Sequence, residues 1–144
     1  MEVFLCTPGC QGALAMVEAS QPHAAGWKEQ GFKTELENNF AKIFAVKQKG
    51  EIFGFVAVRA VAGSAELLNF AVAKDCEGKG AGRALMQKML AALKEENVLF
   101  VTLEVDKNNE RALEFYKKSG FGVIGVRKNF YGAGRDAALM RMDL

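Results

Sequence analysis

The chain has 144 residues, of which half are apolar and a quarter are charged, and its formal net charge at pH 7 is +2. This length fits one domain, residues 1–144, whose core is large enough to need no disulfides. The weak, scattered positive charge does not indicate nucleic-acid binding, and no apolar run approaches the ~20 residues of a membrane span. Three cysteines, an odd number, argue against a disulfide framework. The cytoplasm is therefore the expected compartment.

The first half of the chain predicts a strand, two helices and a β-hairpin, over residues 3–5, 8–20, 28–38, 40–47 and 52–60. Thr7 can cap the first helix and Pro8 can begin it. The turn of the hairpin is expected at Gln48–Glu51, which contains a glycine. Cys6 and Cys10 have no further ligands at metal-binding spacing, so no metal site is predicted.

The second half predicts a buried strand, a helix, a strand, another helix and two final strands, over residues 67–72, 82–93, 99–104, 109–119, 123–127 and 137–142. Apolar residues recur at helical spacing between Leu85 and Leu93, and Gly120 is suited to end the last helix. This order indicates an α/β (α+β) fold, in which one mixed, mostly antiparallel sheet is flanked by helices.

A glycine-rich loop, Gly78–Gly82, lies between the buried strand and the long helix that follows it. Glycines let backbone N–H groups approach a ligand closely, and the unpaired N–H groups of a helix start carry partial positive charge. The segment therefore predicts an anion cradle, and the ligand inferred is a diphosphate.

Three kinds of phosphate-binding loop can be compared with this segment. A Walker loop fails, because Gly80 follows Lys79 where Ser or Thr is needed. A dinucleotide fingerprint matches only in its first half, since Arg83 replaces the last glycine; Glu104, at a suitable distance downstream, keeps this alternative open. The coenzyme A loop, Gln/Arg-x-x-Gly-x-Gly/Ala, matches residues 77–82 except at its first position, Glu77.

Several segments in fixed order extend this match from about Leu67 to the end of the chain: residues 68–72, 77–85, 103–105, 108–109, 112–116, 120–121 and 127–131. Together they resemble the GNAT superfamily of N-acetyltransferases, and within it the ribosomal-protein-alanine N-acetyltransferases (RimI-like enzymes). The resemblance implies a GNAT-type fold with a mostly antiparallel central sheet. It also implies acetyl-CoA as co-substrate, with no metal.

The resemblance assigns the cofactor-binding residues. The backbone of Phe70, Ala71 and Val72 is expected to bind the pantetheine arm and the acetyl group. The diphosphate is expected on the loop residues Gly78, Lys79, Gly80, Ala81, Gly82 and Arg83. Asn109, by its chemistry a helix N-cap, is expected to contact the cofactor as well.

Two residues are the expected catalysts. Glu104, predicted to end a strand, is by resemblance the general base, directly or through a water; a solvated carboxylate at a strand end is the simpler alternative. Tyr116 is by resemblance the general acid. A tyrosine with a pKa of about 10 is protonated at pH 7 and can donate to a thiolate, although a tyrosine at helical spacing is commonly core.

The expected acceptor is the N-terminal amine of a protein or peptide, with alanine as first residue and a ribosomal protein as candidate. Trp27, Phe130 and Tyr131 are the expected substrate-binding residues, and a core anchor is the open alternative for Trp27. A polyamine would call for an acidic cluster, which the sequence lacks. The chain departs from the family at Gly26, where a proline precedes the tryptophan, and in the short loop 132–135.

Three alternatives remain beside this interpretation. One is a GNAT enzyme that acts on a small amine, such as a polyamine or a drug. Another is a non-catalytic acyl-CoA-binding module, which Glu104 and Tyr116 argue against. The last is the dinucleotide-binding protein, which titration with coenzyme A and NAD would separate.

Overall fold

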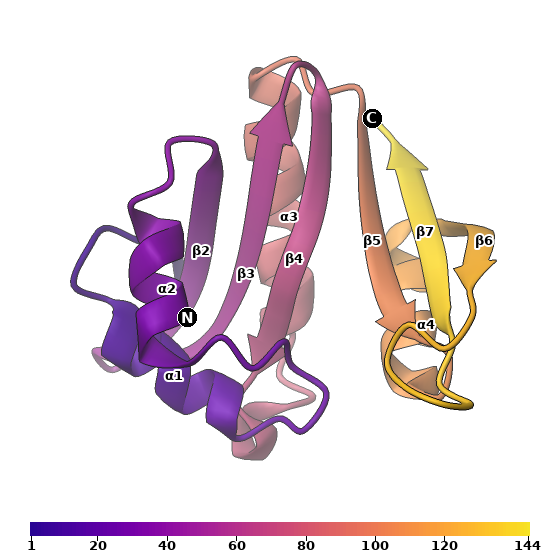
Figure 1. Cartoon of the computed structure of the whole chain (residues 1–144). Coiled ribbons are helices and arrows are strands. Elements are labelled where there is room, and N and C mark those ends of the chain that lie inside the picture. Colours follow the sequence, from indigo (N-terminus) through magenta and orange to yellow (C-terminus); the bar gives the residue numbers. More distant parts are fainter.

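The computed structural model describes residues 1–144 and contains one seven-stranded sheet and four helices (Figure 1). The strands are β1 (Glu2–Leu5), β2 (Ala41–Gln48), β3 (Glu51–Val61), β4 (Ser64–Val72), β5 (Phe100–Asp106), β6 (Gly122–Arg127) and β7 (Ala137–Asp143). The helices are α1 (Gln11–Ala19), α2 (Lys28–Leu36), α3 (Ala81–Glu95) and α4 (Glu110–Ser119), with a short 3-10 turn at Lys74–Cys76. No helix is both long and apolar enough to span a membrane.

The strand order across the sheet is β1-β2-β3-β4-β5-β7-β6. Every neighbouring pair is antiparallel except β4 and β5. Parallel neighbours need a crossover connection, and α3 supplies it on one face of the sheet (Figure 1). The predicted fold class, a mixed and mostly antiparallel sheet flanked by helices, is confirmed.

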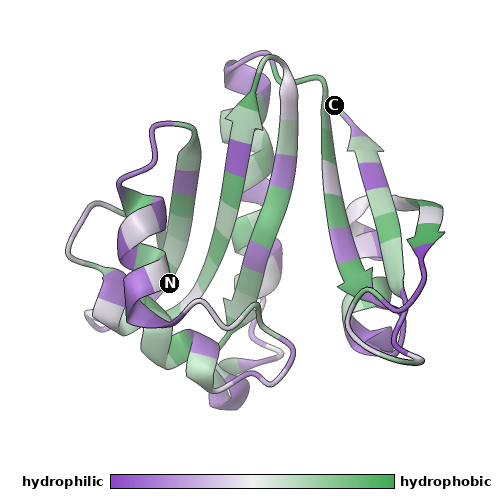
Figure 2. Ribbon diagram, in the orientation of Figure 1, coloured by the Kyte–Doolittle hydropathy of each residue, from purple (hydrophilic) through white to green (hydrophobic).

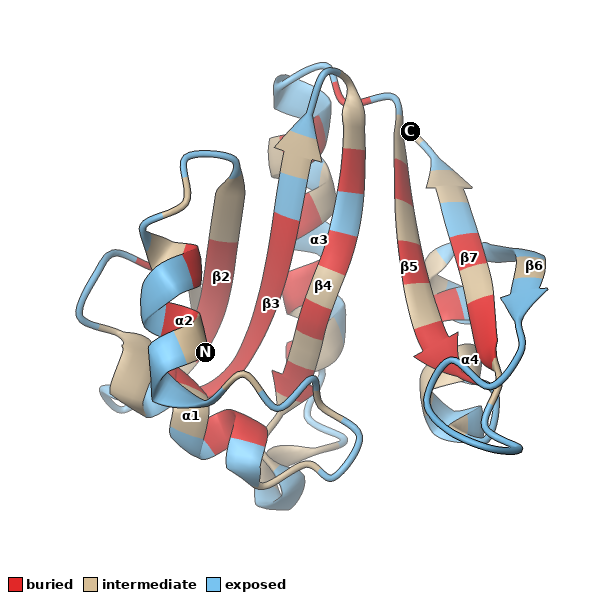
Figure 3. Cartoon of the chain, viewed as in Figure 1, coloured by how far each residue is buried: buried red, intermediate tan, exposed pale blue.

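Two apolar cores lie on opposite faces of the sheet, because successive side chains of a strand point to opposite sides. On β2, Phe44 belongs to the core beneath α3, whereas Ile43 packs with Leu14 of α1 and Phe32 of α2. The middle strands are therefore buried on both faces (Figure 3). They are mostly hydrophobic in Figure 2, with a few hydrophilic bands, whereas the outward sides of the helices carry hydrophilic residues.

The ladder between β4 and β5 is short. It contains three pairs, Ser64 with Phe100, Ala65 with Val101, and Glu66 with Thr102. Beyond these pairs the two strands diverge (Figure 1), so that the rest of β4 pairs only with β3 and the rest of β5 only with β7. Two strand edges with no partner strand therefore face each other in the middle of the sheet.

Aromatic side chains pack β4 against α4 where the ladder has ended. The ring of Phe70 lies 5.4 Å from that of Phe115 and 6.3 Å from that of Tyr116, both in edge-to-face orientation. Phe121 extends the cluster, 5.8 Å from Tyr116. Edge-to-face aromatic packing thus replaces backbone hydrogen bonds in holding the two halves of the sheet together on this face.

Several predicted boundaries were wrong by two or three residues; β4, for example, begins at Ser64 instead of Leu67. The first helix begins at Gln11 instead of Pro8, because Thr7–Gly9 form a turn in which the N–H of Cys10 donates to the carbonyl oxygen of Thr7. Gly9 has φ +115°, a conformation that no helix contains. Strand β5 runs on to Asp106, so Glu104 lies within the strand and not at its end.

A close contact at Gly54 of β3 yields a stability prediction. A Cβ at this position would lie 2.9 Å from Val46 Cγ1 and 3.3 Å from Leu85 Cδ1. Gly54→Ala should therefore lower the free energy of unfolding by roughly 1–3 kcal/mol through overpacking, as measured by urea denaturation. Gly122→Ala on β6, where a Cβ meets nothing within 4 Å, is the matched control and should change it by less than about 0.5 kcal/mol. Equal effects would contradict the packing argument.

Candidate active site

A cavity of about 1000 Å³ lies where β4 and β5 diverge. Its walls come from both strands, the glycine-rich loop, the start of α4, and two loops that approach from elsewhere in the chain, residues 21–25 and 130–135. A cavity of this size can enclose a ligand larger than a typical drug molecule. The opening of the sheet is thus also its largest potential binding site.

The exposed edge of β4 offers backbone groups to this cavity. The N–H of Ala73 donates to Phe53 O of β3 at 2.7 Å. In an antiparallel ladder such residues alternate with ones whose N–H and C=O groups point the other way. Phe70 and Val72 therefore direct their backbone groups toward the open edge, as predicted for a strand that binds an extended ligand.

The glycine-rich loop has the geometry of an anion cradle. Gly78 and Gly80 have φ of +80° and +85°, and a Cβ on either would meet nothing within 4 Å. Gly80 is the N-cap of α3 and no side chain caps this helix, so its first N–H groups lack protein acceptors. Gly82 differs from these two, since its Cβ would make van der Waals contact with the ring of Phe115 at 3.4 Å.

The predicted loop residues do not all line the cavity. Gly78, Gly80, Ala81, Gly82 and Arg83 do, and so do Phe70, Ala71, Val72 and Asn109. Lys79 does not. Asn109 is confirmed as the N-cap of α4, since its Oδ1 accepts from the N–H of Ala112 at 3.2 Å; its contact with a cofactor stays a prediction.

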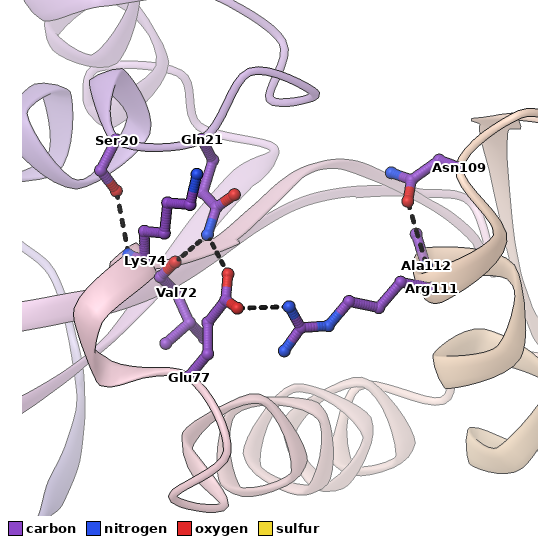
Figure 4. A network of polar contacts seen from close by, with 8 residues as sticks. All are labelled: Ser20, Gln21, Val72, Lys74, Glu77, Asn109, Arg111 and Ala112. Carbon is purple, nitrogen blue, oxygen red and sulfur yellow. Dashed lines mark hydrogen bonds and ion pairs between the residues drawn. The ribbon is translucent and has the colours of Figure 1, made fainter.

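Glu77, the departure at the first position of the loop, has two partners (Figure 4). Its carboxylate accepts from the side-chain amide of Gln21 and pairs with the guanidinium of Arg111 at the start of α4. These two partners hold the pKa of Glu77 below its ordinary value. Gln21 Nε2 also donates to Val72 O at 2.8 Å. The negative charge beside the cradle is therefore compensated, and the network connects three segments around the mouth.

Glu104 is the one residue with a buried polar side-chain atom that lacks a partner. Its Oε2 is buried without a hydrogen bond, while Oε1 lies 3.4 Å from Arg127 Nη1. Buried carboxylate oxygens are nearly always hydrogen-bonded. Because Glu104 lines the cavity, its free oxygen is suited to a donor group on a molecule bound there.

Tyr116 also lines the cavity and is 8% exposed. Burial raises the pKa of its hydroxyl above the ordinary value, and the neighbouring Tyr131 raises it further. A raised pKa keeps a tyrosine protonated. The Tyr116 hydroxyl is therefore protonated at neutral pH, and its role as a proton donor stays a prediction.

The loop between β6 and β7 is fixed by its own hydrogen bonds. The N–H of Asn129 donates to Asp136 Oδ1 at 2.9 Å, and Asn129 Oδ1 accepts from the N–H of Gly134 at 2.9 Å. Arg135 Nη2 pairs with Asp106 Oδ2 of β5 at 2.8 Å. Although short, the loop is thereby tied to the strand that carries Glu104.

Two aromatic residues of this loop lie at the cavity, as predicted. The rings of Phe130 and Tyr131 are edge-to-face at 5.0 Å, and both residues line the cavity. Burial raises the pKa of the Tyr131 hydroxyl, and the negative charges of Glu104 and Asp106 add to this. Tyr131 therefore lies close enough to Glu104 for the carboxylate charge to affect the pKa of its hydroxyl.

Trp27 does not line the cavity, so its expected place in the substrate wall is not supported. Its ring packs edge-to-face on Phe32, with centroids 5.3 Å apart, at the border of the second core. The wall on this side comes instead from the preceding residues, Gln21, Pro22, His23, Ala24 and Ala25. No periodicity or motif in the sequence identified these loop residues, or Arg111 and Arg135, as part of the site.

An open strand edge, a helix start without a side-chain cap and a buried carboxylate oxygen without a partner thus lie around one cavity. Residues 13–121 match the Acetyltransferase (GNAT) family. The [ribosomal protein bS18]-alanine N-acetyltransferase of Escherichia coli K12 is 31% identical over 120 residues, which are 82% of this chain and 80% of that protein. The chain therefore belongs to the GNAT family and is an N-acetyltransferase.

Solved structures agree with this assignment. The crystal structure of the ribosomal-protein-S18-alanine N-acetyltransferase from Escherichia coli gives a TM-score of 0.89 at 26% identity, covering 99% of this chain and 92% of that one. The PaiA N-acetyltransferase from Thermoplasma acidophilum, solved in complex with coenzyme A, has the same fold, with a TM-score of 0.83 at 18% identity over the full length of both chains. The GNAT family uses acetyl-CoA, and the cradle and free strand edge fit that molecule.

The Glu77–Arg111 pair makes a testable contribution to co-substrate affinity. Arg111→Ala would leave the carboxylate of Glu77 uncompensated beside the phosphates and should raise the KM for acetyl-CoA about three- to fivefold, the effect of a partly exposed ion pair. In a Glu77→Gln background the same substitution should have a smaller effect. Lys118→Ala, which removes a charge from the exposed side of α4, is the control. Equal effects in both backgrounds would show that Arg111 does not act through Glu77.

Proposed function

We propose that this N-acetyltransferase transfers the acetyl group of acetyl-CoA to the α-amine of a protein N-terminus, alanine before other first residues, and that a ribosomal protein is its natural acceptor. The observation that carries the proposal is Glu104 Oε2, a buried carboxylate oxygen without a partner beside the open strand edges. The similarity to the bS18-alanine N-acetyltransferase supports the choice of acceptor.

Acetyl-CoA fits along the open edge of β4. The uncapped start of α3 and the loop Gly78–Arg83 would hold the diphosphate through backbone N–H groups. The backbone groups of Phe70 and Val72 would hold the pantetheine arm, with Asn109 as a further contact from the facing side. When bound, acetyl-CoA supplies an acetyl thioester, whose sulfur leaves as a thiolate.

Glu104 has the geometry of a general base. One of its oxygens is engaged by Arg127, which leaves Oε2 to accept a proton from the acceptor amine, directly or through a water. The pKa of an α-amine is near 8, so a neutral nucleophile is within easy reach of a carboxylate base at pH 7. Val105 and Asp106 continue β5 beyond Glu104, so the backbone that carries this side chain is held within the strand.

Tyr116 has the properties of the general acid. Its raised pKa keeps the hydroxyl protonated, and it can donate that proton to the departing thiolate sulfur. One proton then leaves the amine for Glu104 and one reaches the sulfur from Tyr116, so the transfer is balanced. Proton exchange with solvent then returns Glu104 to its carboxylate form and Tyr116 to its protonated form.

The acceptor side favours a small first residue over a polyamine. Phe130 and Tyr131 stand against the cavity from one loop and would leave little room beside the reacting amine. The carboxylates nearby are largely paired, Glu104 with Arg127 and Asp106 with Arg135. A polycation would call for several uncompensated carboxylates close together, and Glu66 is the only acidic residue lining the cavity that has no ion pair.

Removal of the Tyr116 hydroxyl tests its role. Tyr116→Phe keeps the ring in its aromatic cluster, so folding should be nearly unchanged while kcat falls between about 10²- and 10⁴-fold. Because burial raises its pKa, the wild type should show no loss of kcat from ionisation of this group up to about pH 10. Circular dichroism and steady-state kinetics check both points. Wild-type turnover by the variant would remove Tyr116 from the mechanism.

The acceptor is tested by direct comparison. Release of coenzyme A is measured with an alanine-initiated peptide of a small-subunit ribosomal protein, with the same peptide blocked at its N-terminus, and with spermidine. The free peptide should be the best acceptor and the blocked one inactive, because only the first presents an α-amine. Faster acetylation of spermidine, or modification of the blocked peptide at lysine, would refute the N-terminal acceptor but not the acetyltransferase.

A further inference from the structure

Glu18 is a buried carboxylate that the proposed mechanism does not use. It lies on α1, 4% exposed, and all its partners are N–H donors. Oε2 accepts from the N–H of Trp27 at 2.9 Å and from Asn69 Nδ2 at 2.7 Å, while Oε1 accepts from the N–H of Lys28 at 2.9 Å. A buried carboxylate is tolerated only when it is bonded in this way.

These bonds place the carboxylate at the start of α2. Trp27 is the N-cap residue of α2 and caps nothing with its own side chain. Glu18 therefore satisfies two N–H groups at the helix start from a different helix, and its negative charge lies at the positive end of the helix dipole. The end of the loop that precedes α2 is thereby fixed to α1.

Asn69 extends the connection into the active site. It is also 4% exposed, and its Oδ1 accepts from the N–H of Ala25 at 3.3 Å. It immediately precedes Phe70, whose backbone faces the open edge, and it lines the cavity itself. The pair Glu18–Asn69 is thus a buried polar bridge between α1, β4 and the loop 21–27.

The loop contains a glycine that its own surroundings do not hold in place. Gly26 has φ +76°, and a Cβ there would meet nothing within 4 Å, so local packing does not restrain it. The bridge holds the N–H groups on both sides of this glycine, Ala25 through Asn69 and Trp27 through Glu18. At its other end the loop is held by Gln21, which donates to Val72 O.

We infer that Glu18 and Asn69 are positioning residues that hold the loop 21–25 as the acceptor-side wall of the cavity, and thereby set the affinity for the acceptor peptide. The inference rests on the proposed function, because it requires a peptide that lies against this wall. The diphosphate cradle Gly78–Arg83 is a separate segment, whereas Asn69 shares β4 with the backbone edge that would hold the pantetheine arm. Loss of Glu18, which lies on α1, should therefore affect the peptide far more than acetyl-CoA.

The test compares Glu18→Gln with Glu37→Gln, which removes an exposed carboxylate at the C-terminal end of α2. Steady-state kinetics with the alanine-initiated peptide are measured below the unfolding temperature of each variant. Glu18→Gln should raise the KM for the peptide about tenfold, a size typical for a misplaced positioning group, and leave kcat and the KM for acetyl-CoA within about twofold. The control should match the wild type in all three parameters.

A reciprocal exchange of the two side chains distinguishes loss of the Glu18–Asn69 contact from a general loss of stability. Glu18→Gln combined with Asn69→Asp restores an amide and a carboxylate that face each other, and should recover part of the lost peptide affinity. Amide hydrogen exchange at Ala25 and Trp27 should be faster in Glu18→Gln than in the wild type, and slower again in the exchange variant.

The outcomes separate the two claims. An unchanged peptide KM in folded Glu18→Gln, or equal rises in the KM of peptide and acetyl-CoA, would overturn the inference while the proposed function stands. If the wild type acetylates spermidine but no peptide, the proposed acceptor fails and the inference fails with it.

Discussion

The early end of the ladder between β4 and β5 is the constraint on which the rest of the structure depends. After Glu66 and Thr102 the two strands share no backbone hydrogen bonds, and unpaired strand edges inside a protein are costly unless a partner satisfies them. The aromatic cluster around Tyr116 holds the two halves together on one face. The opening therefore exists without collapse of the sheet, and it exposes the backbone that a pantetheine arm would need.

Charge pairing around the opening distinguishes the carboxylates from one another. Glu77 is engaged by Gln21 and Arg111, Asp106 by Arg135, and Glu18 by three N–H donors. Among the buried polar side-chain atoms only Glu104 Oε2 lacks a partner. The paired carboxylates thus hold loops in place, and Glu104 is the one that offers a buried oxygen to a ligand.

Sequence patterns predicted those parts of the site that depend on local rules. Apolar periodicity located the strands and helices, the glycine spacing located the cradle at Gly80, and the cap at Asn109 followed from helix chemistry. The position of Glu104 within its strand was misjudged by two residues, because the pairing of β5 with β7 extends the strand beyond the apolar run.

The remaining features depend on contacts between distant segments. Glu77 is 56 residues from Gln21 and 34 from Arg111, so no local pattern could show that its charge is compensated. Trp27 was expected at the substrate, but the docking of α2 turns its ring toward Phe32. The compensated charge of Glu77 and the position of the Trp27 ring both depend on contacts that form only in the folded chain.

The central claim is that the open edge of β4 binds the co-substrate through its backbone. Amide hydrogen exchange, measured with and without coenzyme A, tests it residue by residue. Coenzyme A should slow exchange at Phe70 and Val72, which face the opening, by clearly more than at Ala71, which faces β3 in the ladder. Equal protection of all three amides, or none, would contradict the claim.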